Sequence, residues 1–159
     1  ISVAIASASV VAIFQINAVT KNSSDDMVAI RDAQYAGYWI SRDTLVSENV
    51  IVDNDPGTPN FLTFTWTEWG YEEDSIYHSA TYSFLNLVDG VGILKRTYWS
   101  SAGANEVTVV AEHIYYNPSD PVNTTQAVYV TPVLTLKIAA LSGDALTTKE
   151  YKIWRRPEF

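Results

Sequence analysis

Charged side chains are absent from the first twenty residues of the chain, which are mostly apolar. At about 1.5 Å per residue, a helix over this run is roughly 30 Å long, about the thickness of a bilayer core. A helix that is apolar on all sides must be buried on all sides. The pattern therefore predicts burial in lipid, in other copies of the same segment, or in both. Because the chain begins at Ile rather than Met, we expect its true start to have been removed or to lie upstream.

Helical periodicity continues beyond the apolar run. Residues 21–48 contain no Pro and one Gly, and small or apolar residues recur there at steps of three and four: Ile30, Ala33, Gly37 and Ile40. Charged and amide residues are expected largely on the rest of the helical wheel: Arg31, Asp32, Gln34, Arg42 and Asp43. This predicts one helix from near Ile1 to about Ser47, amphipathic in its second half. The polar junction at 21–26 is where we expect bending or local melting.

Alternation of apolar and polar residues predicts strands in the rest of the chain, after a segment rich in turn formers at 53–59. The expected strands are 61–66, 76–84, 92–99, 107–111, 127–140 and 147–154. Their short connections, rich in Gly, Pro, Asp, Asn and Ser, favour hairpins and an antiparallel sheet. Pro132, inside the longest expected strand, predicts an edge position or a bulge. The ten Tyr, five Trp and five Phe suit β-structure.

Length and pattern together predict one folded unit. The expected fold class is α+β, with a long N-terminal α-helix packed against a mainly antiparallel β-sheet head. Residues 1–24 form the apolar helix half, and residues 25–159 form the head. The head contains the amphipathic helix half at 25–48 and a β-rich region at 60–156.

Charge and cysteine content exclude several functions. The net charge is −8, and no basic cluster exceeds Arg155 and Arg156, so a nucleic-acid partner is not expected. The absence of Cys excludes disulfides, thiol catalysis and Cys-based zinc sites. A leftover signal peptide is disfavoured, because no basic residue precedes the apolar run and the run continues past the Ala-Ser-Ala at 6–8.

Candidate catalytic and metal sites are few. The two histidines, His78 and His113, lie in different expected strands, where a structural role is the usual one. An acidic turn with neighbouring aromatics would suit a glycosidase or a sugar platform, but a solvated hairpin with its aromatics packed on one face is the favoured interpretation: Glu68, Glu72, Glu73 and Asp74, with Trp66, Trp69 and Tyr71. The triplet at 53–55 (Asp-Asn-Asp) offers oxygen ligands for calcium but lacks the rest of a twelve-residue loop, which favours a turn. We therefore expect no enzymatic activity, no cofactor and no metal.

Two triplets match the N-glycosylation pattern, beginning at Asn22 and Asn123. They are candidate modification sites only in an organism that glycosylates its surface filaments.

The mostly apolar helix, followed by Trp39-Ile40-Ser41-Arg42-Asp43 near its end, resembles type IV pilin-like proteins, in particular minor pilins and the J-type pseudopilins of type II secretion. The later order is also similar: Ala80-Thr81-Tyr82-Ser83-Phe84, then Leu94-Lys95-Arg96-Thr97-Tyr98, then Val109-Val110-Ala111-Glu112-His113-Ile114. These short motifs are spread over most of the chain.

The resemblance implies a subunit held in the inner membrane before assembly and then extracted into a filament at the cell surface, or into a periplasmic pseudopilus. Its partners would be other copies of itself or other pilins. The implied assembly interface is Ile1, Val3, Ala4, Ile5, Ala8, Val11, Ala12, Phe14, Ile16 and Val19. The small residues of the run fit close helix packing: Ala4, Ala6, Ser7, Ala8, Ser9 and Ala12.

One departure from the family pattern concerns the start of the chain. Mature pilin-like chains begin with a methylated aromatic residue, after cleavage behind a Gly, and carry a Glu at the fifth position. None of these is present here. If the resemblance holds, either the first eight to ten mature residues are missing or the start is a variant one.

Two other functional classes stay open at this point. One is a membrane-anchored, β-rich binding module, an adhesin or a sugar- or polymer-binding protein, that does not polymerise. The other is an anchored hydrolase that uses the region 72–74.

Overall fold

The computed structural model describes residues 2–53, 60–70 and 75–155, with side chains from residue 21 onward in those ranges. Within this part, one helix precedes eight strands. The elements are α1 (Ser2–Val46), β1 (Asn49–Val52), β2 (Asn60–Trp69), β3 (Ser75–Val88), β4 (Val91–Ser100), β5 (Asn105–Tyr115), β6 (Gln126–Val130), β7 (Val133–Ser142) and β8 (Ala145–Trp154).

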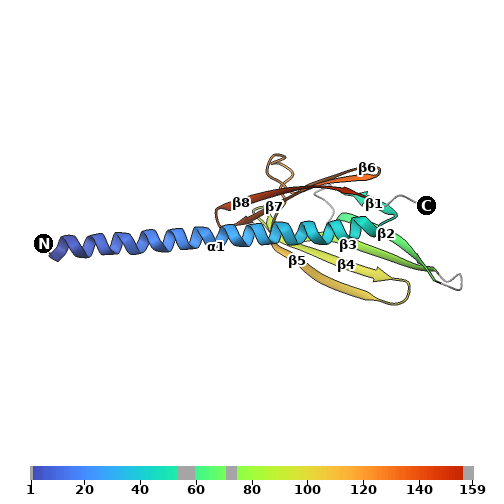
Figure 1. The fold of residues 1–159 in the computed structure, drawn as a ribbon, viewed down its shortest axis with the longest axis horizontal. Coiled ribbons are helices and arrows are strands. Elements are labelled where there is room, and N and C mark those ends of the chain that lie inside the picture. Colours follow the sequence, from blue (N-terminus) through green and yellow to red (C-terminus); the bar gives the residue numbers. More distant parts are fainter. Residues whose placement is uncertain (1, 54–59, 71–74, 156–159) are drawn as a thin grey trace.

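Helix α1 begins well beyond the sheet and ends beside its strands. Its N-terminal turns extend away from the strands, whereas its C-terminal turns run alongside them (Figure 1). The backbone is helical throughout residues 21–26, so the polar junction lies inside a continuous helix. The helix contacts mainly β8, β7 and β5.

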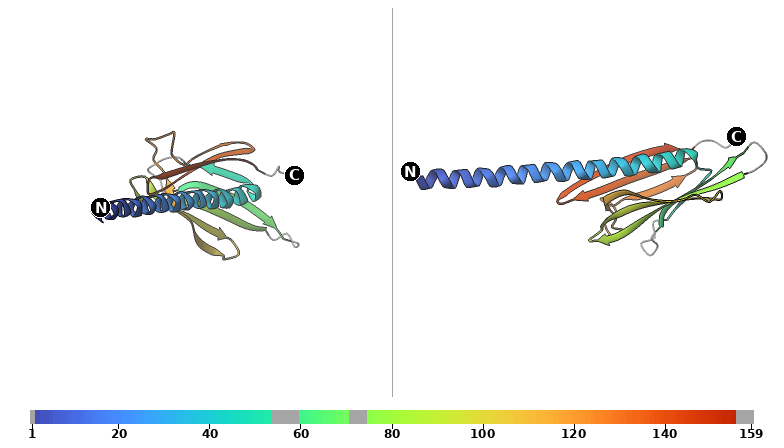
Figure 2. Two further views of the ribbon diagram at one scale, coloured as in Figure 1. Left: turned by 60° about the vertical axis from the view of Figure 1, so that its left-hand side comes forward. Right: turned by 90° about the horizontal axis from the view of Figure 1, so that it is seen from below.

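All eight described strands join one antiparallel sheet. Strands β1 to β5 form a meander in which each strand pairs with the next. The order then changes, because β7 pairs with β5, β6 and β8. Strands β5 and β7 share one register pair, Ile114 with Ala140, so β5 separates from the β6–β8 group along most of its length. Figure 2 shows α1 on one side of this divided sheet.

Irregular pairing bends the strands. The register shifts between Asn60 and Leu62, between Leu85 and Val88, and on both sides of Leu94. Each such irregularity adds to the natural right-handed twist and bends the strand that carries it. The result is a sheet curled into a half-barrel.

The predicted α+β class, with a long N-terminal helix packed against a sheet head, was therefore wrong. The structure is mostly β: strands hold 59% of the residues with described side chains, against a helical part of about 26 residues. The physical reason is that the sheet curls into a half-barrel. The helical residues that touch the strands belong to the core of this half-barrel and do not form a separate layer comparable in size to the sheet.

The core lies between α1 and the concave face of the sheet. The helix contributes fully buried small residues, Ala29, Ala33 and Ala36, together with Ile40. Small side chains let the helix backbone approach the strands closely. The strands contribute the large buried side chains: Phe61, Leu62, Phe64, Tyr82, Leu94, Ile114, Leu134, Leu136 and Ile138.

Five of the six expected strands are confirmed, each lying within one observed strand. The sixth, 127–140, was wrong as a single strand, because β6 ends at Val130 and β7 begins at Val133. Pro132 therefore lies in the turn between two strands, after a cis peptide bond, and not at an edge or a bulge within one strand. The short strand β1 was not predicted.

The buried face of the helix differs from the predicted one at three positions. Ile30 is 39% exposed, whereas Asp32 and Asp43 are buried at 4% and 2%. Both carboxylates thus lie on the face that was assigned to apolar residues, and both bind groups of the sheet.

Candidate functional site

The last turns of α1 are joined to the sheet by a buried ion pair. Arg96 on β4 donates from Nε to Asp43 Oδ2 over 2.6 Å and from Nη2 to Oδ1 over 3.1 Å. The Tyr82 hydroxyl on β3 donates to the same Oδ2 over 2.6 Å. One helical carboxylate therefore ties together two strands of the meander, through charge-assisted bonds of the strong kind.

Burial and charge act together on this cluster. Burial raises the pKa of Tyr82 far above its usual value, and the negative charge of Asp43 raises it further. Burial alone would lower the pKa of Arg96, but the hydrogen bonds and charge of Asp43 outweigh it and raise that pKa. The tyrosine thus stays a neutral donor and the arginine stays a cation, which excludes both from proton transfer near neutral pH.

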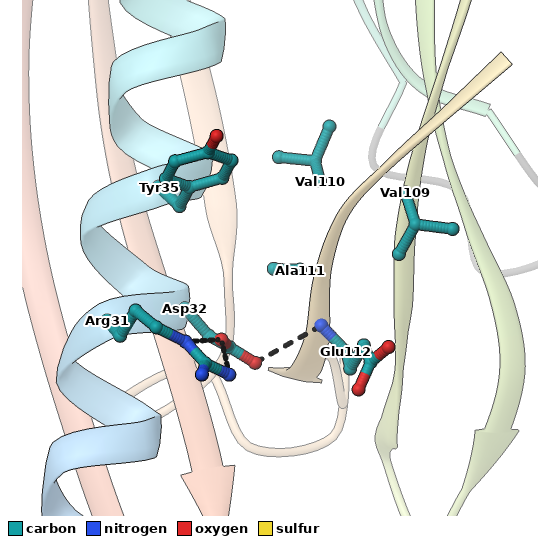
Figure 3. Close-up of a pocket in the computed structure, with 7 residues that line it drawn as sticks. All are labelled: Arg31, Asp32, Tyr35, Val109, Val110, Ala111 and Glu112. Carbon is teal, nitrogen blue, oxygen red and sulfur yellow. Dashed lines mark hydrogen bonds and ion pairs between the residues drawn. The ribbon is translucent and has the colours of Figure 1, made fainter.

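Asp32, further toward the N-terminus of α1, makes a second connection. Its Oδ2 accepts from the backbone N–H groups of Glu112 and His113 on β5, each over 3.1 Å, and lies 2.9 Å from His113 Nδ1. Its Oδ1 accepts from Arg31 Nη2 over 2.9 Å. Figure 3 shows Arg31, Asp32 and Glu112 meeting at one end of a groove between the helix and β5.

The pKa of Asp32 is lowered on balance. Burial raises it, but hydrogen bonds from His113, Arg31 and the Glu112 backbone outweigh that effect. Asp32 is therefore a carboxylate at neutral pH, and its charge is matched by donors from both the helix and the strand.

The groove in Figure 3 has a volume of about 340 Å³ and follows β5 at 109–112, with Arg31, Asp32 and Tyr35 on the helix side. Val110 points toward the helix and is buried, whereas Val109 points away and is 53% exposed. In this region β5 has separated from β7. The Asp32 carboxylate accepts hydrogen bonds from backbone N–H groups that would otherwise be available to a neighbouring strand. It therefore protects part of an open sheet edge.

The two histidines have structural partners and are not brought together. His113 is bound by Asp32 as described above. His78 on β3 has its Nδ1 2.7 Å from the Tyr98 hydroxyl, and its ring stacks on Trp66 with centroids 5.1 Å apart. Glu68 Oε2 lies 3.3 Å from His78 Nε2. These contacts fix the orientation of the rings.

Several predicted site residues fall outside the described side chains. They include the whole implied assembly interface: Ile1, Val3, Ala4, Ile5, Ala8, Val11, Ala12, Phe14, Ile16 and Val19. Residues 54–55 of the calcium candidate and residues 71–74 of the acidic turn also lie outside the described residues. Trp69, at the end of β2, is described and is 74% exposed.

The two glycosylation candidates have different surroundings. Asn22 is exposed on α1. The side-chain amide of Asn123 donates to Asp120 over 3.0 and 3.3 Å, and the next residue, Thr124, is 4% exposed and accepts from the Asn117 backbone. A glycan on Asn123 would have to replace these bonds.

Among residues with described side chains, no group of three or more His, Cys, Asp and Glu could hold a metal ion. Over the same residues, no helix is both long enough and apolar enough to cross a membrane.

Comparison with known proteins adds no relative: no family model, no curated protein and no solved structure matches the chain. Asp32 and Asp43, which the sequence reasoning placed on the wet face, are eleven residues apart, a spacing that returns to the same helix face after three turns. That spacing, within a stripe of small residues, is the signal that could have identified them.

Proposed function

We propose that the chain is the structural subunit of a type IV pilus-like extracellular filament or of a pseudopilus, assembled through its charge-free N-terminal run. The observation that carries the proposal is the continuity of α1 from Ser2 to Val46. The helix passes from the charge-free run into the sheet without a break at the polar junction. The run is thus a stiff extension of the folded part, directed away from it (Figure 1).

The composition of the run suits packing against copies of itself. Small residues such as Ala4, Ala8 and Ala12 recur at steps of four, which places them on one helix face. In a medium as apolar as the side chains, helices associate by close backbone approach, and small residues permit it. A lone anchor has no such need.

The anchoring of the helix supports a structural role. A subunit that assembles through one end of a helix needs its folded part fixed to the other end. The bonds of Asp32 and Asp43 to β3, β4 and β5 provide this attachment. In this proposal the subunit resides in the inner membrane before assembly and in a filament afterwards, and its partners are other copies or related subunits.

The test is assembly of the full chain after detergent removal, followed by negative-stain electron microscopy. We expect filaments from the unaltered chain and none from Ala8→Arg or Ala12→Arg, because a charge inside an apolar helix bundle is unfavourable by several kcal/mol. Ser24→Arg, which adds the same charge at an exposed position, is the matched control and should still polymerise. A chain that stays monomeric under all conditions, or filaments that tolerate both interface variants, would contradict the proposal.

A further inference from the structure

A second groove lies where α1 ends, remote from the N-terminal run. Its volume is about 330 Å³, at the lower end of the roughly 300–1,000 Å³ typical of small-molecule sites. It is lined by the last turns of α1, by β2 and β4, and by the start of β5: Arg42, Asp43, Val46, Trp66, Arg96, Tyr98 and Glu106. At about 1.5 Å per residue, it is roughly 30 Å along the helix from residue 20.

Aromatic rings form one wall of this groove. The Trp66 and Tyr98 rings have centroids 6.1 Å apart and planes 28° apart, and His78 lies 5.1 Å from the first and 5.9 Å from the second. If the three rings were stacked in one straight column, the longest centroid distance would equal the sum of the other two. The distances are instead nearly equal, so the near-parallel rings are offset-stacked in a three-ring cluster, the ring platform, rather than in one column.

The polar groups of the groove differ in how many of their hydrogen-bonding positions are already occupied, and Glu106 accepts one bond, from the Thr108 hydroxyl over 3.3 Å. Arg96 and Asp43 bind each other and Tyr82. Arg42 is different: its guanidinium stacks 4.1 Å above the Trp39 ring, and its side chain is 48% exposed with its ion-pair contact to Asp43 at 3.7 Å. Stacking fixes the plane of the guanidinium and leaves its edge N–H groups available.

Glu106 supplies the complementary acceptor. It is exposed at the start of β5, directly opposite Tyr98 in the β4–β5 register. A ligand on the ring platform thus meets a cationic donor on the helix side and an anionic acceptor on the strand side. Since Arg42 and Glu106 balance each other in charge, the groove favours a neutral ligand with both donors and acceptors. The net charge of −8 also disfavours an anionic polymer.

We infer that this groove binds a neutral sugar ring of an oligosaccharide or polysaccharide. The apolar face of a pyranose would lie on Trp66 and on the part of the Tyr98 ring that the Arg96 guanidinium, 5.2 Å from the ring centroid, leaves uncovered. The sugar hydroxyls, which donate and accept, would bond Glu106 and Arg42. This site is independent of assembly through the N-terminal run, since it lies at the other end of the helix.

The experiment titrates the full chain in detergent micelles with cellohexaose, chitohexaose and maltohexaose, by calorimetry and tryptophan fluorescence. We expect saturable binding of at least one of the three. Glu106→Gln and Arg42→Gln should each weaken it about tenfold, the loss typical of a hydrogen bond to a charged group. Tyr98→Ala should abolish it. Trp99→Ala, the neighbour on the opposite face of β4, is the matched control and should bind normally.

Thermal unfolding of each variant separates loss of the site from loss of the fold. Glu106→Gln is the decisive variant, because its exposed side chain can change without disturbing the core. Absence of saturable binding by all three sugars would overturn the inference, as would equal weakening by Trp99→Ala. Binding of a proline-rich peptide by the same residues, with no sugar binding, would reassign the groove to peptide recognition and overturn it too.

Discussion

At the scale of single residues, the most consequential feature is the pair of carboxylates on the buried face of α1. A charge in the core is costly unless its partners surround it. Asp43 has three donated hydrogen bonds from Arg96 and Tyr82, and Asp32 has donors from both α1 and β5. Each carboxylate therefore specifies where the helix lies on the sheet, because sliding the helix by one residue would leave the charge without its donors.

Replacing Asp43 or Arg96 by Ala should destabilise the protein by about 3–5 kcal/mol, because either change leaves a buried charge unpaired. Tyr82→Phe should cost less, about 1–3 kcal/mol, since Arg96 still neutralises Asp43. The measurement is urea unfolding followed by circular dichroism. Arg42→Ala, which removes an exposed arginine from the same helix turn, should cost about 1 kcal/mol or less. Equal costs for Arg42→Ala and Arg96→Ala would show that burial of the pair does not matter.

Asp32 should make stability depend on pH in the acid range. Its pKa in the folded state lies below the ordinary value of 3.8, so its stabilisation is complete above that value and is lost as the pH falls through the folded pKa. The free energy of unfolding of the unaltered protein and of Asp32→Asn should therefore differ by about 1–3 kcal/mol at pH 7, and the difference should shrink as the pH falls below 3.8. Asp26→Asn, at an exposed position of α1, is the control and should track the unaltered protein. A difference that stays constant from pH 7 to pH 2 would refute the assignment.

At the scale of elements, the alternation of apolar and polar residues predicted most strands. It failed where this local pattern does not reflect the pairing between strands. Alternation identifies β2, β3 and β4 because one face of each is buried. The segment 127–140 is apolar on both sides of Thr131 and Pro132, so a turn there is masked by its neighbours. Strand β1 has four residues, too few to alternate visibly.

The groove and the anchors were missed for a different reason. A charged residue in a helical pattern is assigned to water by default, and the partners that stabilise Asp43 in the core, Arg96 and Tyr82, lie on strands far away in the sequence. Likewise, the curl arises from bulges beside Leu62, Val88 and Leu94, which depend on pairing between strands. Trp66 and His78 can each be identified in the sequence, but their stacking with Tyr98 depends on how β2, β3 and β4 pair.

The contact between α1 and β8 depends on Gly37. A Cβ at this position would overlap the Tyr151 ring, whose hydroxyl is 3.4 Å from the Ala33 carbonyl. Although Gly→Ala favours an isolated helix by about 1 kcal/mol, Gly37→Ala should destabilise the protein by about 1–3 kcal/mol through overpacking. Thermal or urea unfolding measures this.

The control for this prediction is a double-mutant cycle with Tyr151→Ala. Removing the ring makes room for the methyl group, so Gly37→Ala should become neutral or stabilising in that background. The same destabilisation in both backgrounds would mean that the helix backbone, and not the ring, sets the cost.

At the scale of the whole molecule, the proposed filament would separate stability and assembly into different segments of the chain. Among the residues of α1 with described side chains, from residue 21 onward, the buried ones begin at Ala29, and the strands they contact all follow the helix. A chain lacking residues 1–20 should therefore fold cooperatively with a Tm within a few degrees of the full chain, and it should stay monomeric. Calorimetry and analytical ultracentrifugation test this. Unfolding of the shortened chain would show that the N-terminal run supports the fold.

The route of α1 across the half-barrel has a mechanical consequence. A pull on the Ser2 end acts along the helix axis, and the anchors at Asp32 and Asp43 lie along that same axis. Tension is therefore shared by both ion-pair clusters and the Gly37 contact at once, in shear, instead of breaking them one after another as peeling would. The attachment of the helix therefore resists a pulling force most strongly along the helix axis, the direction in which a filament would be stretched.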